Sequence, residues 1–345
     1  MSAVTSVATG EELLDALRSG ATTVEIQGSI SGTPMVTLDP GVTVRGGTIR
    51  FGAKGIRMTS DNTIDGVTVV TAEDEVAILN DTSVSDLGTL TVRGVRATGQ
   101  VHLLAQDTVR SGHVHVEGMT IDRADGRGRV ERPHGFGVEA LQGAFTLWNR
   151  QEDGAGVLTA ELLDIGVGTA DSPVQGSGVS VGGHGDWQGG ADGGTVRVST
   201  LRTGEVHTDG GIPAGTPDLI SGGVFVITGA DVAHVVNAGP VTTNGPSDVV
   251  LDNWGRMDGW TAESAVTSNG PGGSVGSVHI GGRVATRGDN VVTVEIEGEV
   301  GAIDVAGGIV LEGEGSDAVH VHGTVGGLSE VDIRADHGRR VVHSD

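Results

Sequence analysis

The sequence predicts an all-β protein, a single parallel β-helix with a short capping helix at its N-terminal end. The first observation is the glycine content. Each of the 61 glycines in these 345 residues would cost about 1 kcal/mol in a helix relative to alanine, which excludes a largely helical protein. The second observation is a series of short segments in which apolar and polar residues alternate. The third is a repeat of about 25 residues near the C-terminus.

A helix is expected over residues 9–20. Thr9 is placed to cap its N-terminus, and Glu12, three residues later, completes a capping box. Apolar residues follow at helical spacing, and Gly20 is a typical residue just after a helix C-terminus. No other stretch of the sequence has a convincing helical pattern.

From Thr23 onward the predicted elements are strands. Val24 and Ile26 alternate with polar residues, and the same period of two returns in many later runs of three to five residues. Glycine, asparagine or aspartate bounds each run. Strands this short, with turns this frequent, favour a solenoid or a sandwich over a doubly wound sheet.

Internal repeats favour the solenoid over the sandwich. Residues 294–301 return as residues 319–326, with their apolar and glycine positions in phase. A second pattern, in which Val is followed by Thr or Ser two residues later and by Gly four residues later, starts at Val206, Val241, Val266 and Val284. Such repeats are typical of coils that bury their inward residues only by stacking on their neighbours.

This pattern resembles the right-handed parallel β-helix, or pectin-lyase-like, superfamily. An amphipathic helix that starts near Glu11 is followed by short strands punctuated by Gly and Asn as far as about Arg334. The resemblance implies one domain over residues 1–345, in which the helix covers the open end of the stack. An uncovered end would present unpaired strand edges, which favour aggregation. Residues 261–334 are expected to form regular C-terminal coils.

The charge balance argues against nucleic acid as a partner. There are 21 Lys and Arg residues against 45 Asp and Glu residues, so the net charge is −24, and the basic residues are scattered rather than gathered in a stripe. Lys54 is the only lysine, which we interpret as codon bias. The absence of cysteine excludes disulfides, thiolate metal sites and thiol nucleophiles.

Membrane insertion is not expected either, because no apolar run approaches the length of a membrane span. The N-terminus lacks the basic and apolar regions of a signal peptide. We therefore expect a soluble protein, either cytoplasmic or a mature secreted form. A homo-oligomer formed through flat faces of the solenoid is an alternative to a monomer.

The regular alternation of short strands and turns is interrupted between residues 122 and 260, which we expect to form a loop-rich face. Residues 166–194 contain 11 glycines and are expected to hold a long excursion. Excursions from a rigid solenoid are where binding sites are built. All four tryptophans lie in or beside this region, namely Trp148, Trp187, Trp254 and Trp260.

A doubled His-x-Asp sequence is the sharpest candidate for chemistry. His184-Gly-Asp186 and His207-Thr-Asp209 are separated by close to one coil, so Asp186 and Asp209 are expected to stack on one face. Carboxylates about 5–5.5 Å apart suit a retaining glycosidase, and about 6.5–9.5 Å an inverting one. Alternatively, both aspartates bond to the backbone of their own turns. A divalent cation bound by the same four side chains is a third interpretation.

A second cluster lies within a short stretch, between Asp252 and Trp260. It contains Trp254, Arg256 and Asp258 as well, which is unusual in a chain with 2% aromatic residues. The functional interpretation is an aromatic platform for sugar rings, with the charged groups bonding to sugar hydroxyls. The alternative is a loop that its tryptophans anchor on the outer wall.

These clusters predict a carbohydrate-active enzyme of the glycoside hydrolase or glycosyl-transfer type, acting on a glycan or oligosaccharide without a cofactor. The catalytic candidates are Asp186, Asp209, Asp252, Asp258, His184 and His207. The candidates for substrate binding are Trp187, Trp254, Trp260, Arg256, Trp148 and His134. A non-catalytic glycan-binding or structural β-helix is the first alternative, because a fold does not imply a function. A polysaccharide lyase is the second.

Overall fold

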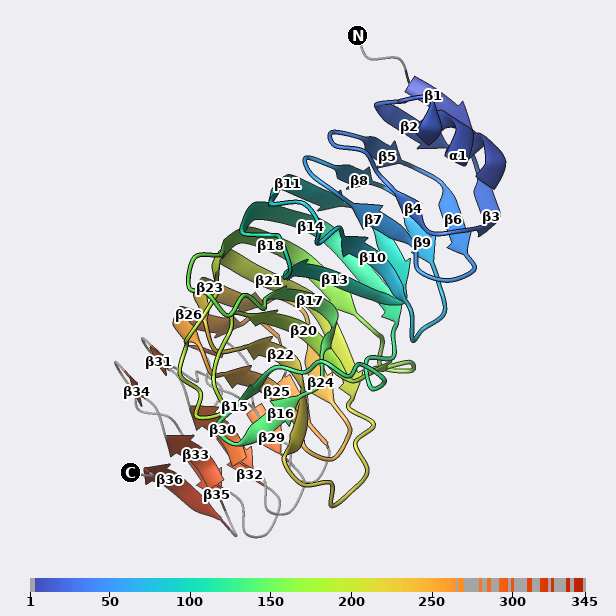
Figure 1. The fold of residues 1–345 in the computed structure, drawn as a ribbon. Helices are drawn as coiled ribbons and strands as arrows, with labels where there is room; N and C mark the ends of the chain where they lie inside the picture. Colours follow the sequence, from blue (N-terminus) through green and yellow to red (C-terminus); the bar gives the residue numbers. More distant parts are fainter. Residues whose placement is uncertain are drawn as a thin grey trace.

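The computed structural model describes residues 4–264, 266–269, 279–280, 284–286, 292–296, 299–300, 309–311, 317–321, 324–325, 333–335 and 338–343. It is an all-β structure built from long parallel sheets, with α1 (Gly10–Arg18) as the one helix of the described residues. Figure 1 shows α1 at one end of the stack of strands and β36 at the opposite end.

The first sheet contains 23 of the described strands. They are β1 (Val4–Val7), β2 (Thr23–Ile26), β3 (Ser29–Thr33), β5 (Thr43–Arg45), β6 (Thr48–Phe51), β8 (Thr63–Asp65), β9 (Thr68–Val70), β11 (Asp86–Arg93), β12 (Arg96–Thr98), β14 (Ser111–Arg123), β18 (Val157–Val167), β19 (Val174–Gln175), β21 (Thr195–Asp209), β23 (Ala230–Asn237), β24 (Val241–Thr243), β26 (Arg256–Ala262), β27 (Val266–Ser268), β28 (His279–Ile280), β29 (Val284–Thr286), β31 (Glu299–Val300), β32 (Ile309–Leu311), β34 (Thr324–Val325) and β35 (Ile333–Ala335).

The second sheet has ten strands, and it carries the groove described below. They are β4 (Val36–Thr37), β7 (Ile56–Met58), β10 (Val76–Asn80), β13 (Gln100–Ala105), β17 (Gly143–Asn149), β20 (Ser177–Gly182), β22 (Leu219–Val226) and β25 (Asp248–Asn253), with β15 (His134–Gly135) and β16 (Val138–Ala140) at one edge. A third sheet contains β30 (Val292–Ile296), β33 (Asp317–Val321) and β36 (Arg339–His343). Among the described strands, β15 and β16 form the one antiparallel pair.

The predicted helix is confirmed, and its capping follows the sequence pattern. The side chain of Thr9 accepts a hydrogen bond from the backbone N–H of Glu12, and Glu12 in turn accepts one from the N–H of Ala8. Leu13 and Ala16 are buried on the face that packs against β1, β2 and β3. The helix therefore covers the strands at the N-terminal end of the first sheet.

The predicted repeats stack on one another. Val294 pairs with Val319 in parallel register, so the repeat found in the sequence is one step of the stack. Val206, Val241, Val266 and Val284, the four starts of the shorter pattern, also pair in sequence from β21 to β29. Stacked apolar positions of this kind form the core, because each strand buries its inward residues against the strands before and after it.

The length of the step varies along the chain. Val24 pairs with Val44, whereas Val116 pairs with Leu162, more than twice as far along the chain, because the long segment between β14 and β17 is inserted there. The long excursion expected within residues 166–194 does not fill that range. Residues 177–182 form β20, whose side chains are all buried, and their glycines permit close approach of the neighbouring strands.

A buried carboxylate joins the two large sheets. Asp248 of β25 accepts hydrogen bonds from the hydroxyls of Thr208 (2.8 Å) and Ser221 (3.0 Å) and from the N–H of Gly210 (3.1 Å). Its side chain is fully buried, and this burial raises the pKa of Asp248 to about 7, even though the hydrogen bonds lower it.

This pKa shift predicts a pH-dependent stability. Between about pH 4 and pH 7 the unfolded chain has released the proton of Asp248 while the folded chain retains it, so the free energy of unfolding should fall as the pH rises, by at most about 1.4 kcal/mol per pH unit. Asp248→Asn stays neutral and should remove this slope from urea-unfolding curves measured at pH 4, 5, 6 and 7. A slope of the same size in Asp248→Asn would assign the effect to other groups.

Candidate functional site

The outer face of the second sheet carries the candidate site. Strand pairing aligns one outward row of side chains across five strands, namely Thr37, Arg57, Leu79, His102 and Thr146. The neighbouring residues along each strand point inward and form the core, as the alternation of a β-strand requires. The sheet therefore offers a floor of polar and apolar side chains that is backed by an apolar core.

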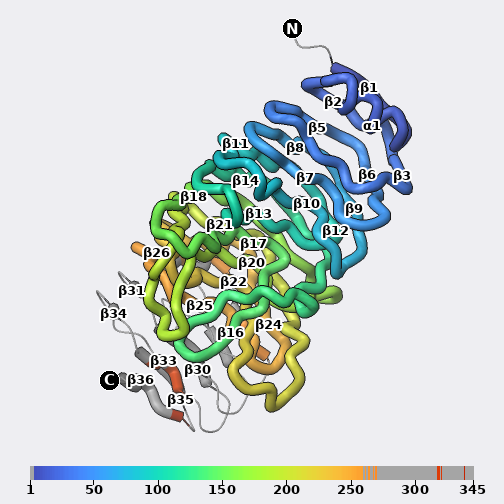
Figure 2. The backbone as a smooth tube through the Cα atoms, in the orientation of Figure 1, coloured from blue at the N-terminus to red at the C-terminus, as the bar shows by residue number. Residues whose placement is uncertain are grey.

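Residues 124–142, which we call the covering segment, run across this face (Figure 2). At one end, the guanidinium of Arg129 donates to the side chain of Gln100 and to the carbonyl of Asp74. At the other end, β16 pairs with the start of β22. Ala140 of β16 joins Phe225, Ile227 and Trp254 in a second apolar cluster. The segment is thus fixed at both ends.

Three neighbouring cavities lie beside the covering segment, and together we call them the groove. Their volumes are about 430, 610 and 200 Å³. Arg150 and Glu131 line all three, so the cavities meet at this pair. The first cavity lies over β7, β10 and β13, and the third lies at the ends of β17 and β20.

The first cavity has a cationic lining, in contrast to the acidic chain as a whole. Four cationic side chains line it, namely Lys54, Arg57, Arg129 and Arg150, against the two carboxylates of Asp81 and Glu131. His102 also lines it but adds no charge, because burial, with a contribution from Arg129, lowers the pKa of its imidazole to about 3. The first cavity is therefore a place for an anionic group. The second cavity has the opposite balance, with four carboxylates and Arg150.

Arg150 is held by three neighbouring side chains. Its guanidinium donates to the side-chain oxygens of Gln106 (2.7 Å) and Glu131 (2.6 Å), and it lies 4.8 Å from the ring centre of Trp148. The indole N–H of Trp148 donates to the carbonyl of Gly183, which fixes the ring. Three neighbours therefore hold one planar cation at the junction of the three cavities.

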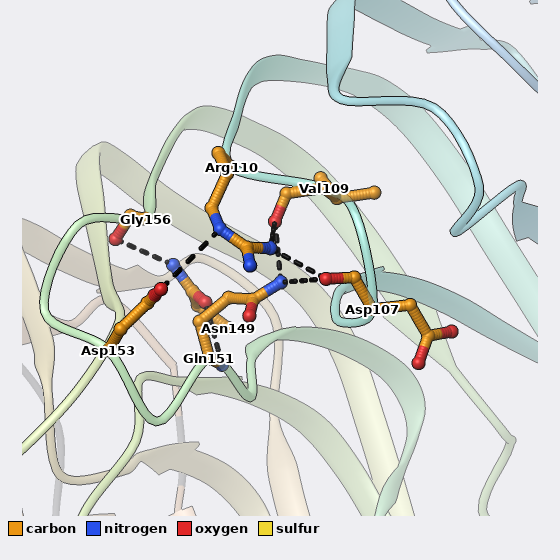
Figure 3. A network of polar contacts seen from close by, with 7 residues as sticks. All are labelled: Asp107, Val109, Arg110, Asn149, Gln151, Asp153 and Gly156. Atoms are coloured by element: carbon orange, nitrogen blue, oxygen red, sulfur yellow. Dashed lines mark hydrogen bonds and ion pairs between the residues drawn. The ribbon is translucent and has the colours of Figure 1, made fainter.

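The loops that flank Arg150 are held by the polar network of Figure 3. The side chain of Gln151 donates to the carbonyls of Asp107 and Val109, and Arg110 donates to the same two carbonyls. The side chain of Asn149 donates to the carbonyl of Gly156. The residues on both sides of Arg150 are thus tied to the neighbouring loop and to each other, so the position of Arg150 is determined by the backbone.

Residues 183–194 form a hairpin that stands at the third cavity. The Nδ1 atom of His184 is 2.6 Å from the carboxylate of Asp192 across this hairpin. The ring of Trp187 stacks on His134 of the covering segment, with 4.5 Å between ring centres and an angle of 20° between the rings. The N–H of Gly137 also donates to the carbonyl of Trp187. The hairpin and the covering segment are therefore in direct contact.

The structure does not stack Asp186 on Asp209. Asp186 accepts hydrogen bonds from the N–H groups of Gln188 and Gly190 within its own turn. Asp209 pairs instead with Gln175 of β19, which lies farther back in the chain than Asp186 does. Of the three interpretations from the sequence, the local turn is the one that the hydrogen bonds of Asp186 support.

The carboxylates of the second predicted cluster also have structural partners. Asp252 is buried, and its carboxylate accepts the indole N–H of Trp254 at 3.1 Å. Arg256 forms ion pairs with Asp231 (2.9 Å) and with Asp258 (2.7 Å). Asp252, Arg256 and Asp258 do not line any of the three cavities of the groove.

The predicted aromatic and histidine residues are divided between the groove and the interior. Trp148, His134 and His184 line the third cavity, and Trp187 contacts it through His134. Trp254 is 3% exposed and packs edge-on against Phe225 and Phe136, so the prediction of an open platform there is wrong. His207 is buried in β21. The backbone of Trp260 pairs with Val235, while its side chain lies outside the described part of the chain, as does most of residues 261–334.

The sequence interpretation missed Lys54, Arg57 and Arg150 as cations of the groove. Lys54 and Arg57 lie at β7 and Arg150 directly follows β17, and the stacking of β7, β10, β13 and β17 brings them to one face.

Among the described residues, no group of three or more His, Asp or Glu side chains is arranged to hold a metal ion. Within the same part of the chain, no helix has the length and apolar character needed to cross a membrane. Comparison of the chain with protein-family models, with curated proteins and with solved structures found no match.

Proposed function

We propose that the chain is a right-handed parallel β-helix and that its groove binds a glycan carrying carboxylate or sulfate groups. The parallel stacking of predicted repeats supports the first part, because successive strands that pair in parallel along two faces are what such a helix requires. The cationic first cavity is the observation that carries the second part.

The charge of the first cavity supports an anionic ligand. Four of the 21 basic residues line one cavity in a protein that has 45 acidic residues, and the only lysine is among them. The charge of the whole chain repels anions, so the cavity offers an anion a local site only if its cations are held at the surface of the groove. Arg129 and Arg150 are held in this way by their hydrogen bonds.

The remaining lining supports a sugar chain rather than a small inorganic anion. Gln106 and Gln142 line the first cavity, and an amide group can both donate and accept hydrogen bonds, as sugar hydroxyls require. The cavities continue for several strands in the stacking direction, which suits an elongated ligand. The side chain of Trp148 adds an apolar surface to the third cavity.

Binding assays with a panel of glycans test this proposal. We expect the protein to bind at least one of polygalacturonate, hyaluronan and heparin in isothermal titration calorimetry, and not dextran. The affinity should fall between about 50 mM and about 500 mM NaCl, because ionic contacts are screened. Equal binding of dextran, or binding of none of the three acidic polymers, would overturn the proposal.

Hydrolysis of the bound glycan is a second candidate, favoured by Glu131 and Glu152, two carboxylates that line the third cavity. A glycosidase needs one carboxyl group to protonate the leaving oxygen and another to act on water or on the sugar. Under this candidate, Glu152→Gln should still bind the acidic polymer but should no longer release shorter oligosaccharides from it. Unchanged release by Glu152→Gln would exclude the candidate.

A further inference from the structure

The groove is closed at the end where the third cavity lies. Ile227 and Gly183 line this cavity together with His134 and His184, and Ile227 belongs to the buried apolar cluster beneath the covering segment. The covering segment and the hairpin 183–194 meet above it through the stacked rings of His134 and Trp187. A chain lying in the groove therefore meets a wall of side chains here.

Close packing makes this wall continuous. A Cβ atom added at Gly189 would lie 2.4 Å from the ring of Phe136, so hairpin and covering segment are in contact without a gap at this position. The hydroxyl of Thr228 donates to the carbonyl of Gly189 at 3.4 Å, which ties the same point to the loop that follows β22. The hairpin thus contacts the covering segment on one side and the second sheet on the other.

The space beyond the wall is a separate cavity. It has a volume of about 290 Å³ and is lined by Gly189, Ala191 and Trp254, whereas the third cavity is lined by the opposite side of the hairpin, at Gly183 and Gly185. The two cavities have no lining residue in common. The hairpin therefore separates the third cavity from this one.

We infer that the groove receives one end of a glycan chain and does not bind along the middle of the chain. The inference rests on the proposed function of the groove. The terminal sugar lies in the third cavity, between Trp148 and the wall formed by His134 and Trp187, and the acidic groups of the following sugars lie along the cations of the first cavity. Trp187 acts as a positioning residue, because it holds the His134 ring that lines the cavity.

The stoichiometry of binding to polymers of different length tests this inference. Polygalacturonate and hyaluronan, each prepared as a six-sugar oligomer and as chains of about 20 and 60 sugars, are titrated with the protein in calorimetry and in sedimentation velocity. An end-binding groove binds one protein per chain at every length, because each chain has one end of the fitting polarity. A groove open at both ends binds a number of proteins that grows with chain length.

A stoichiometry that rises with length, measured with a polymer that does bind, overturns the inference and leaves the proposed function intact. Failure of both polymers and of heparin to bind overturns the proposed function and the inference with it. His134→Ala and Trp187→Ala should each weaken binding of the six-sugar oligomer roughly 3- to 10-fold, as expected for loss of an aromatic contact. Gln188→Ala, in the same hairpin but outside the stack, should bind as the unaltered protein does, and equal losses in all three variants would contradict the role of the stack.

Discussion

Replacing Arg150 by alanine should weaken binding of the acidic glycan about 10- to 100-fold. This range corresponds to the loss of one hydrogen bond to a charged group, about 1.5–3 kcal/mol. Arg150 lines all three cavities, so no path along the groove avoids it. Calorimetric titration of the six-sugar oligomer gives the change in affinity directly.

Two further variants test whether the position and shape of the Arg150 guanidinium, and not only its charge, determine binding. Arg202→Ala removes the same charge from an arginine that pairs with Asp164 on the other sheet, and it should bind like the unaltered protein. Arg150→Lys should bind at an intermediate level, because an ammonium group cannot replace the planar fork that contacts Gln106 and Glu131. Equal binding by Arg150→Ala and Arg202→Ala would show that the groove is not the binding site.

Replacing Trp254 by alanine should lower the free energy of unfolding by about 3–5 kcal/mol, the usual cost of deleting a large buried aromatic ring. The ring is 3% exposed and lies 5.5 Å from that of Phe225 and 6.0 Å from that of Phe136. Its removal leaves a cavity beneath the covering segment and takes away the N–H donor to the buried carboxylate of Asp252. Urea unfolding followed by circular dichroism measures the loss.

Two control variants give free energies of unfolding with which the loss in Trp254→Ala can be compared. Trp254→Phe keeps most of the apolar contact and loses the hydrogen bond to Asp252, so its cost should lie well below that of Trp254→Ala. Val130→Ala changes a side chain of the covering segment that is 91% exposed, and its effect should stay within about 0.5 kcal/mol. A cost of Trp254→Ala as small as that of Val130→Ala would mean that Trp254 does not anchor the covering segment.

Sequence pattern correctly predicted the features that depend on regular spacing along the chain. The helix, its capping by Thr9 and Glu12, and the parallel stacking of residues 294 and 319 all follow from spacing along the chain. The predicted stacking of Asp186 and Asp209 failed for a related reason. It assumed a constant step, whereas Asp209 stacks on the more distant Gln175, because loops of different length separate the strands.

Local sequence patterns are enough to specify a stack of short parallel strands with a helix at one end. Glycine spacing and the alternation of apolar residues suffice for this, because each strand is specified by its own side chains and by a turn next to it. The position of the groove depends on the tertiary structure. Lys54 and Arg57 at β7 and Arg150 after β17 come together because strands many residues apart are neighbours in the sheet, and Arg129 joins them from the covering segment. The groove ends where two inserted segments meet through His134 and Trp187. No local pattern encodes such contacts, because their register is fixed by the lengths of all the intervening loops.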